Sequence, residues 1–283
     1  MDWSRDGADW PNHGASRFVE SRPHRWHVQV AGTGPAILLI HGTGAATHSW
    51  RDVLPLLAST HRVIAPDLPG HGFTRLGSRR RSSLPAMAED LWTLCDTLGE
   101  RPQVLAGHSA GAAIALAMER MRPGAERIAG INAALGSFEG PASWLFPSMA
   151  RALAAMPLVP VAVAGLLGAT GGSDQILRAT GSRIDATGRR LYRRLVRSPS
   201  HVEGALEMMA QWSTRAIGEA LPGIAAPVRL LTGERDAAVP PGVSHDAASR
   251  LADARVVSLG ALGHLAHEEA PGIAAGLIRA DPD

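Results

Sequence analysis

Short apolar runs alternate with longer helix-forming segments from about residue 25 to residue 133. Each run is about five residues long and mostly aliphatic, which predicts a buried strand. Strands that alternate with helices in this way are typical of a parallel sheet with helical crossovers. The predicted strands of this part are 36–40, 62–66, 103–106 and 128–133.

Strand-like runs are missing from about Leu135 to Leu221, where the composition is helical, and they resume at 228–233 and 255–259. We therefore expect an α/β fold with a mostly parallel central sheet, flanking helices and an inserted helical cap. The expected parts are an N-terminal core at 1–133, the cap at 134–220 and a C-terminal core at 221–283.

The stretch from Gly107 to Gly111 reads Gly-His-Ser-Ala-Gly and joins a predicted strand to a predicted helix. A strand, a tight turn and a helix in this order form a nucleophile elbow, which raises a serine oxygen above the end of a sheet. Strand and helix then approach so closely that a side chain at either glycine would clash. Ser109 is therefore the predicted nucleophile.

An acid and a base follow Ser109 in the order typical of this kind of site. Asp236 lies in a loop after the run 228–233, and His264 lies in a loop after the run 255–259. Because each residue comes just past a strand end, we predict a catalytic triad of Ser109, Asp236 and His264.

Backbone N–H groups beside the serine are predicted to bind the oxyanion of an acyl transition state. The first comes from Thr43, in the glycine-rich loop that follows the strand 36–40. The second comes from Ala110, directly after the nucleophile. Such a site requires neither a metal nor an organic cofactor, and none of the twelve histidines has a convincing metal-ligand spacing.

Two further residues could be confused with triad members. His267 is the main competitor of His264, but its position three residues later favours a structural role. Asp67 precedes the serine, so we expect it to fix a loop instead of serving as the triad acid. His108, beside the nucleophile, either lines the substrate site or packs under the elbow.

The predicted cap contains an uncharged stretch from Ala152 to Ser173. Its length resembles a membrane span, but Pro157 and Pro160 interrupt it, so we expect buried packing within the cap. Either arrangement gives the site an apolar roof and favours a bulky hydrophobic ligand. The predicted substrate-binding residues are His108, Trp144, Phe146 and Met149.

Five arginines occupy one side of a predicted helix in the cap, opposite an apolar side. This side is either a solvated surface or a docking strip for anionic lipid headgroups, an acidic partner or substrate carboxylates. The five residues are Arg189, Arg190, Arg193, Arg194 and Arg197.

The length, net charge and cysteine content of the chain exclude some classes of function. The chain of 283 residues has length for one large α/β domain, and a formal net charge of only +2 argues against general nucleic-acid binding. Its one cysteine, Cys95, allows no internal disulfide and favours a reducing compartment. The first twenty residues lack the apolar segment of a signal peptide, so we expect a cytoplasmic protein or one bound to a membrane from that side.

These motifs together resemble the α/β-hydrolase superfamily over nearly the whole chain. Other enzymes of that superfamily attack with a carboxylate, so a serine at the elbow favours acyl chemistry. Within it, the sequence resembles a subfamily of magnesium-chelatase accessory proteins of bacteriochlorophyll synthesis in phototrophic bacteria. The segments that carry this second resemblance are 1–3, 9–12, 16–19, 25–29, 41–52 and 263–269.

The subfamily resemblance implies a tetrapyrrole ligand, either protoporphyrin IX or its magnesium derivative. It also implies contact with magnesium-chelatase subunits and a place at the inner photosynthetic membrane. The first hypothesis is therefore an ester or related acyl hydrolase of this pathway, and the second is a non-catalytic porphyrin-binding or chelatase-assisting protein. The third is a general esterase or a cofactor-free haloperoxidase.

Overall fold

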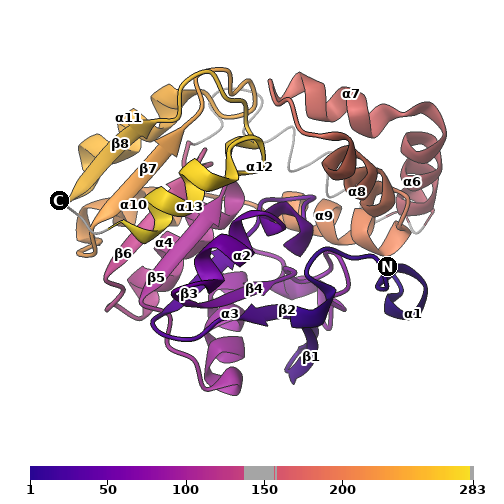
Figure 1. The fold of residues 1–283 in the computed structure, drawn as a ribbon, viewed down its shortest axis with the longest axis horizontal. Coiled ribbons are helices and arrows are strands. Elements are labelled where there is room, and N and C mark those ends of the chain that lie inside the picture. The colour runs from indigo at the N-terminus through magenta and orange to yellow at the C-terminus, as the bar shows by residue number, and fades with distance from the viewer. Residues whose placement is uncertain (137–155, 157, 281–283) are drawn as a thin grey trace.

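The computed structural model describes residues 1–136, 156 and 158–280, which form a layered α/β structure (Figure 1). Its sheet has eight strands in the order β1-β2-β4-β3-β5-β6-β7-β8 within the described residues. The first two strands run antiparallel to their neighbours, and the remaining six are mutually parallel. The strands are β1 (Ser16–Ser21), β2 (His24–Ala31), β3 (Ala36–Ile40), β4 (Arg62–Pro66), β5 (Val104–His108), β6 (Arg127–Ile131), β7 (Val228–Thr232) and β8 (Ala254–Ser258).

Helices cover both faces of this sheet, which explains the continuous apolar runs of its central strands. Alternate residues of β3 belong to two separate cores: Leu38 and Ile40 pack on the side of α3 and α4. Ile37 and Leu39 pack on the side of α2 and α13. The expected mostly parallel sheet with flanking helices is confirmed. The core helices are α2 (Val53–Ala58), α3 (Leu84–Leu98), α4 (Ala110–Met121), α11 (Pro241–Arg250), α12 (Ala266–Glu269) and α13 (Pro271–Arg279).

Between β6 and β7 the described residues form helices and no strand. The helices at 159–211 gather on one side of the molecule, next to the amino-terminal helix α1 (Trp3–Asp6), whereas the helix at 215–220 lies against the core (Figure 1). Trp144, Phe146 and Met149 lie outside the described residues. The helices are α6 (Val159–Thr170), α7 (Gly172–Ala179), α8 (Ala186–Val196), α9 (Pro199–Gln211) and α10 (Arg215–Ala220).

Part of the uncharged stretch 152–173 is visible as α6 and the start of α7. Helix α6 packs through Ala164 against Val202 and Leu206 of α9. Among the described helices, none combines the length and the apolar character needed to cross a membrane.

The turn from β5 into α4 has the strained geometry of a nucleophile elbow. Ser109 has φ 53° and ψ −117°, in a region that non-glycine residues rarely adopt. A Cβ on Gly107 would lie 2.2 Å from the carbonyl oxygen of Gly111, and a Cβ on Gly111 would lie 2.1 Å from that of Ile40. The predicted clashes at both glycines are confirmed, because the obstructing atoms are backbone.

Replacing Gly111 with alanine is expected to lower the free energy of unfolding by about 1–3 kcal/mol or more, because β3 and α4 would have to separate. The control is Gly276→Ala in α13, where an added Cβ meets nothing within 4 Å. There alanine should be neutral or stabilising by up to about 1 kcal/mol. Urea unfolding measures both variants, and equal behaviour would contradict the close approach at the elbow.

Candidate active site

Ser109 lies at the junction of three core elements. Its backbone N–H donates to the carbonyl of Ile131 at the end of β6 (2.9 Å). Its own carbonyl accepts from the N–H groups of Ala112 and Ala134, each at 3.1 Å. These bonds link the elbow to α4 and to the loop after β6, so the strained serine is held by the surrounding backbone.

Asp236 and His264 form a hydrogen-bonded pair next to this elbow. The His264 Nδ1 lies 2.8 Å from Asp236 Oδ2. The other carboxylate oxygen accepts from the backbone N–H groups of Ala238 and Val239, each at 2.8 Å. Burial acts to raise the pKa of Asp236, but the hydrogen bond from His264 and the charge of its ring outweigh burial, so that the pKa lies below its usual range. Asp236 is therefore an ionised acceptor that orients the imidazole.

Asn132 was missed by the sequence analysis. It follows β6 with φ 49°, and its Nδ2 donates to Asp236 Oδ2 and to the carbonyl of Gly263 (3.3 Å). It thereby joins the acid loop to the base loop. Asparagine tolerates this left-handed conformation better than most residues, but the sequence alone does not reveal φ, so it carried no signal for Asn132.

Ser109 and His264 line one cavity of about 390 Å³. Its floor is formed by the elbow and by the loop from Gly42 to Ala45. Its walls are mainly aliphatic and come from α6, α7, α8 and α9, the helices between β6 and β7. The wall residues that carry this apolar character include Val163, Leu167, Ile176, Leu177, Val196 and Leu206.

The two predicted oxyanion-hole residues adjoin the serine. Thr43 lines the cavity, and its Oγ1 donates to Met208 Sδ at 3.3 Å. A Cβ on the preceding Gly42 would lie 3.1 Å from Ser109 Cβ, so this loop passes directly against the nucleophile. Ala110 is the first residue of α4, where backbone N–H groups lack intrahelical acceptors. The role of the Thr43 and Ala110 N–H groups as oxyanion donors stays a prediction.

His108 supports the base loop as well as bordering the cavity. It lies 2.8 Å from the carbonyl of His264 through Nε2, and its ring packs against those of His264 and His267. Burial lowers its pKa well below the usual value, with further lowering from His267 and His264. His108 is therefore a neutral imidazole.

His267 and Asp67 occupy structural positions, as expected. His267 is fully buried, and its Nε2 lies 2.7 Å from Ser49 Oγ. The carboxylate of Asp67 accepts from the backbone N–H groups of Thr47 (2.7 Å) and Phe73 (2.9 Å). Asp67 therefore fixes the loops after β3 and β4.

A buried ionic network that sequence reasoning missed connects α8 to the segment just after His264. Glu268 is an ion-pair partner of Arg51, and it accepts hydrogen bonds from Tyr192 and Ser49, each at 2.7 Å. Arg51 also reaches Asp185, which caps the start of α8 by accepting from the Gly188 N–H.

Tyr192 of this network lines the cavity as well, so the network links the cavity wall to the base loop. Burial raises the pKa of Glu268, although Arg51 opposes that effect. The ionised form of Glu268 consequently depends on its buried partners, above all Arg51.

Residues 35–271 match the family described as the alpha/beta hydrolase fold. The Rhodobacter capsulatus protein named "Magnesium-chelatase 30 kDa subunit" is 46% identical over 273 residues, which cover 96% of this chain and 95% of that protein.

Solved structures resemble the fold at lower sequence identity. An alpha/beta hydrolase fold protein from Burkholderia ambifaria superposes with a TM-score of 0.75 at 23% identity, covering 93% of this chain and 99% of that one. An esterase from Thermogutta terrifontis superposes with a TM-score of 0.74 at 23% identity, covering 93% and 96%. At such identities these structures support the fold and carry no assignment of substrate.

Proposed function

Because the chain belongs to the α/β-hydrolase fold family, we propose that it is a serine hydrolase that cleaves an ester or related acyl bond in an apolar substrate. One observation carries this proposal: a strained elbow serine and a histidine that is hydrogen-bonded to Asp236 border the same apolar cavity. The substrate class follows from the aliphatic cavity walls, since apolar surface favours a ligand that buries apolar area.

In the proposed reaction, Ser109 Oγ attacks the carbonyl carbon while His264 accepts the serine proton. The N–H groups of Thr43 and Ala110 bind the oxyanion that forms. His264 then protonates the leaving alcohol as the acyl–oxygen bond breaks. Water, deprotonated by His264, attacks the acyl-enzyme and releases the acid together with Ser109. Asp236 holds the imidazole tautomer and stabilises the imidazolium throughout.

For the physiological ligand, the proposal is a tetrapyrrole such as protoporphyrin IX or its magnesium derivative, bound in association with magnesium-chelatase subunits. These two macrocycles carry free propionates and no ester, so the bond that is cleaved would belong to an ester derivative of one of them. Support comes from the name of the Rhodobacter capsulatus relative, a magnesium-chelatase subunit. The proposed setting is the cytoplasm, including the surface of the inner photosynthetic membrane. The proposed parts are an N-terminal core at 1–133, a cap at 134–220 and a C-terminal core at 221–283. The proposed substrate-binding residues are His108, Trp144, Phe146 and Met149.

A second candidate is a porphyrin-binding or chelatase-assisting protein that does not use its triad. The same relative favours it, because its name describes a subunit of a metal-inserting enzyme and not a hydrolase. The two candidates differ in whether Ser109 is chemically activated, which can be measured directly.

Fluorophosphonate labelling tests this difference. We expect the wild-type protein to be labelled at Ser109, and both Ser109→Ala and His264→Ala to lose labelling, because an unassisted serine reacts too slowly. The control is His245→Ala, an exposed histidine of α11. Equal labelling of wild type and Ser109→Ala would refute the hydrolase proposal, and no labelling of wild type would favour the second candidate.

Protoporphyrin IX added before the probe tests the ligand separately. Occupancy of the cavity should slow labelling in a concentration-dependent way. Rapid turnover of short-chain p-nitrophenyl esters without any effect of protoporphyrin would instead indicate a general esterase, and peroxide-dependent halogenation would indicate a haloperoxidase.

A further inference from the structure

Helix α8 separates two cavities that share no lining residue. Its inner side contributes Tyr192 and Val196 to the apolar cavity at Ser109. Its outer side contributes Arg190, Arg193, Arg194 and Arg197 to a second cavity of about 380 Å³. Four of the five arginines that the sequence grouped on one face of this helix therefore face away from the candidate active site, while the fifth, Arg189, donates to the carbonyl of Ile184.

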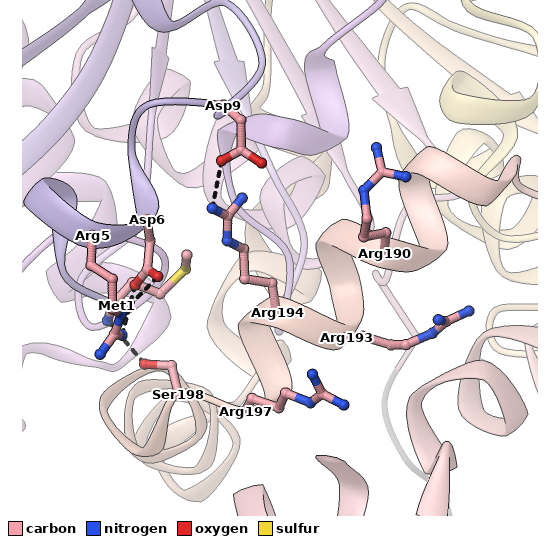
Figure 2. Close-up of a pocket in the computed structure, with 9 residues that line it drawn as sticks. All are labelled: Met1, Arg5, Asp6, Asp9, Arg190, Arg193, Arg194, Arg197 and Ser198. Atoms are coloured by element: carbon pink, nitrogen blue, oxygen red, sulfur yellow. Dashed lines mark hydrogen bonds and ion pairs between the residues drawn. The ribbon is translucent and has the colours of Figure 1, made fainter. Parts of the chain in front are cut away.

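The second cavity, here termed the arginine groove, lies between α8 and residues 1–9, which we call the amino-terminal arm. Figure 2 shows the four arginines along α8, with Asp9 next to Arg194 and with Arg5 and Asp6 beside Met1. The lining thus contains five guanidinium groups and two carboxylates, with Met1 and Ser198 as the remaining residues.

Carboxylates of the protein neutralise only part of this charge. Arg5 pairs with Asp6 at 2.8 Å and Arg194 pairs with Asp9 at 2.5 Å. Arg193 reaches out of the groove to Asp174 of α7 at 2.9 Å. Arg190 donates to a neutral group, Thr187 Oγ1, at 3.5 Å. The lining itself carries five guanidinium groups and two carboxylates, and this excess leaves a positive field over the groove.

The spacing and chemistry of the arginines indicate the kind of ligand. Arg190, Arg194 and Arg197 recur at intervals of four and three residues, so they follow one stripe of the helix over about 10 Å. A guanidinium binds carboxylate and phosphate oxygens through paired N–H donors. A ligand with two or more such groups could bridge the stripe.

The shape of the groove distinguishes a soluble anion from a lipid surface. The arginines line a recess of about 380 Å³ whose opposite wall is formed by Arg5, Asp6 and Asp9. A flat sheet of headgroups would meet only the rim of such a recess, whereas a small anion can enter it. The volume of the groove also falls in the range of small-ligand sites.

We propose that the arginine groove is a second binding site, which takes a small soluble anion carrying at least two phosphate or carboxylate groups. The site is distinct from the cavity at Ser109 and does not depend on hydrolase activity. A bound anion would join α8 to the amino-terminal arm, so occupancy should stabilise the folded protein.

Calorimetric titration with inorganic pyrophosphate and with citrate, at low ionic strength, tests this site. We expect wild type to bind at least one of them with micromolar affinity and to show a higher Tm in its presence. The variant Arg190→Glu/Arg197→Glu should bind at least tenfold more weakly. Arg190→Gln/Arg197→Gln serves as a second variant if charge reversal disturbs folding, and circular dichroism monitors the fold.

The matched control is Arg120→Glu/Arg255→Glu, which changes the net charge equally at exposed positions of α4 and β8. It should bind like wild type. Equal weakening in both charge-reversed variants would overturn the proposal, because general charge would then explain binding. Absence of binding by both anions would overturn it too, as would arginine-dependent binding confined to phosphatidylglycerol vesicles.

Discussion

Replacing Asp236 with asparagine is expected to lower the rate of the reaction at Ser109 by about 10⁴-fold while leaving the fold intact. The carboxylate accepts the His264 Nδ1–H at 2.8 Å, which keeps Nε2 free to take the serine proton. An asparagine can present its NH₂ group to the ring and so favour the opposite tautomer. The ionised state of Asp236, indicated by its lowered pKa, also stabilises the imidazolium that forms.

The second-order rate constant of fluorophosphonate labelling measures this effect without a known substrate. Asp246→Asn, at an exposed position of α11, removes an equal charge far from the pair and should label like wild type. Circular dichroism should show matching spectra for both variants. A labelling rate within threefold of wild type for Asp236→Asn would remove Asp236 from the proposed triad.

Acidification from pH 7.5 to pH 5.5 is expected to remove several kcal/mol of stability. Six buried histidines have pKa values below the usual 6.5, because burial disfavours their charged forms. The values for His48 and His71 are about 3. The other four are lowered as well: His41, His108, His201 and His267.

The sign of this pH dependence follows from which state, folded or unfolded, takes up more protons. Below pH 6.5 the unfolded chain protonates these histidines and the folded protein does not, so falling pH favours unfolding. Each contributes about 1 kcal/mol per pH unit in this window, and six together approach the total stability of a typical domain, about 5–15 kcal/mol. Asp67 and Asp236, whose pKa values are lowered, add to the loss only below about pH 4.

Urea unfolding at several pH values between 7.5 and 5.5 measures this dependence. The ring nitrogens of His48 have no hydrogen-bond partner among the residues that the structure describes, so His48→Phe should reduce the slope of unfolding free energy against pH by about one proton. The exposed His245→Phe should leave that slope unchanged. A free energy of unfolding that stays constant over this range would contradict the prediction, because the buried histidines would then take up protons in the folded state as they do in the unfolded chain.

Much of the fold could be predicted because its signals are local. The apolar runs at 36–40 and 62–66 form β3 and β4 over those residues, and the run at 103–106 overlaps β5, which begins one residue later and ends two residues later. The Gly-His-Ser-Ala-Gly stretch specified its own strained turn, since only glycine fits at Gly107 and Gly111. The match to the alpha/beta hydrolase fold family confirms the resemblance that these motifs indicated.

The residues of the candidate triad could be predicted from the sequence, whereas the residues that hold them in place could not. Chain order singled out Asp236 and His264, and the structure joins them by a hydrogen bond, although their catalytic roles stay a prediction. Nothing local marked Asn132, because its importance comes from where β6 ends relative to two other loops.

By itself the sequence determined the six parallel strands, the elbow and the amphipathic character of α8, because each depends on residues within a few positions of one another. Only the tertiary structure decided how these parts meet. It brought Arg51, Tyr192 and Glu268 together from distant positions, and it set the amino-terminal arm opposite the arginines of α8. Among 28 basic and 26 acidic residues, periodicity cannot reveal which charges pair, since pairing follows from packing of the whole chain.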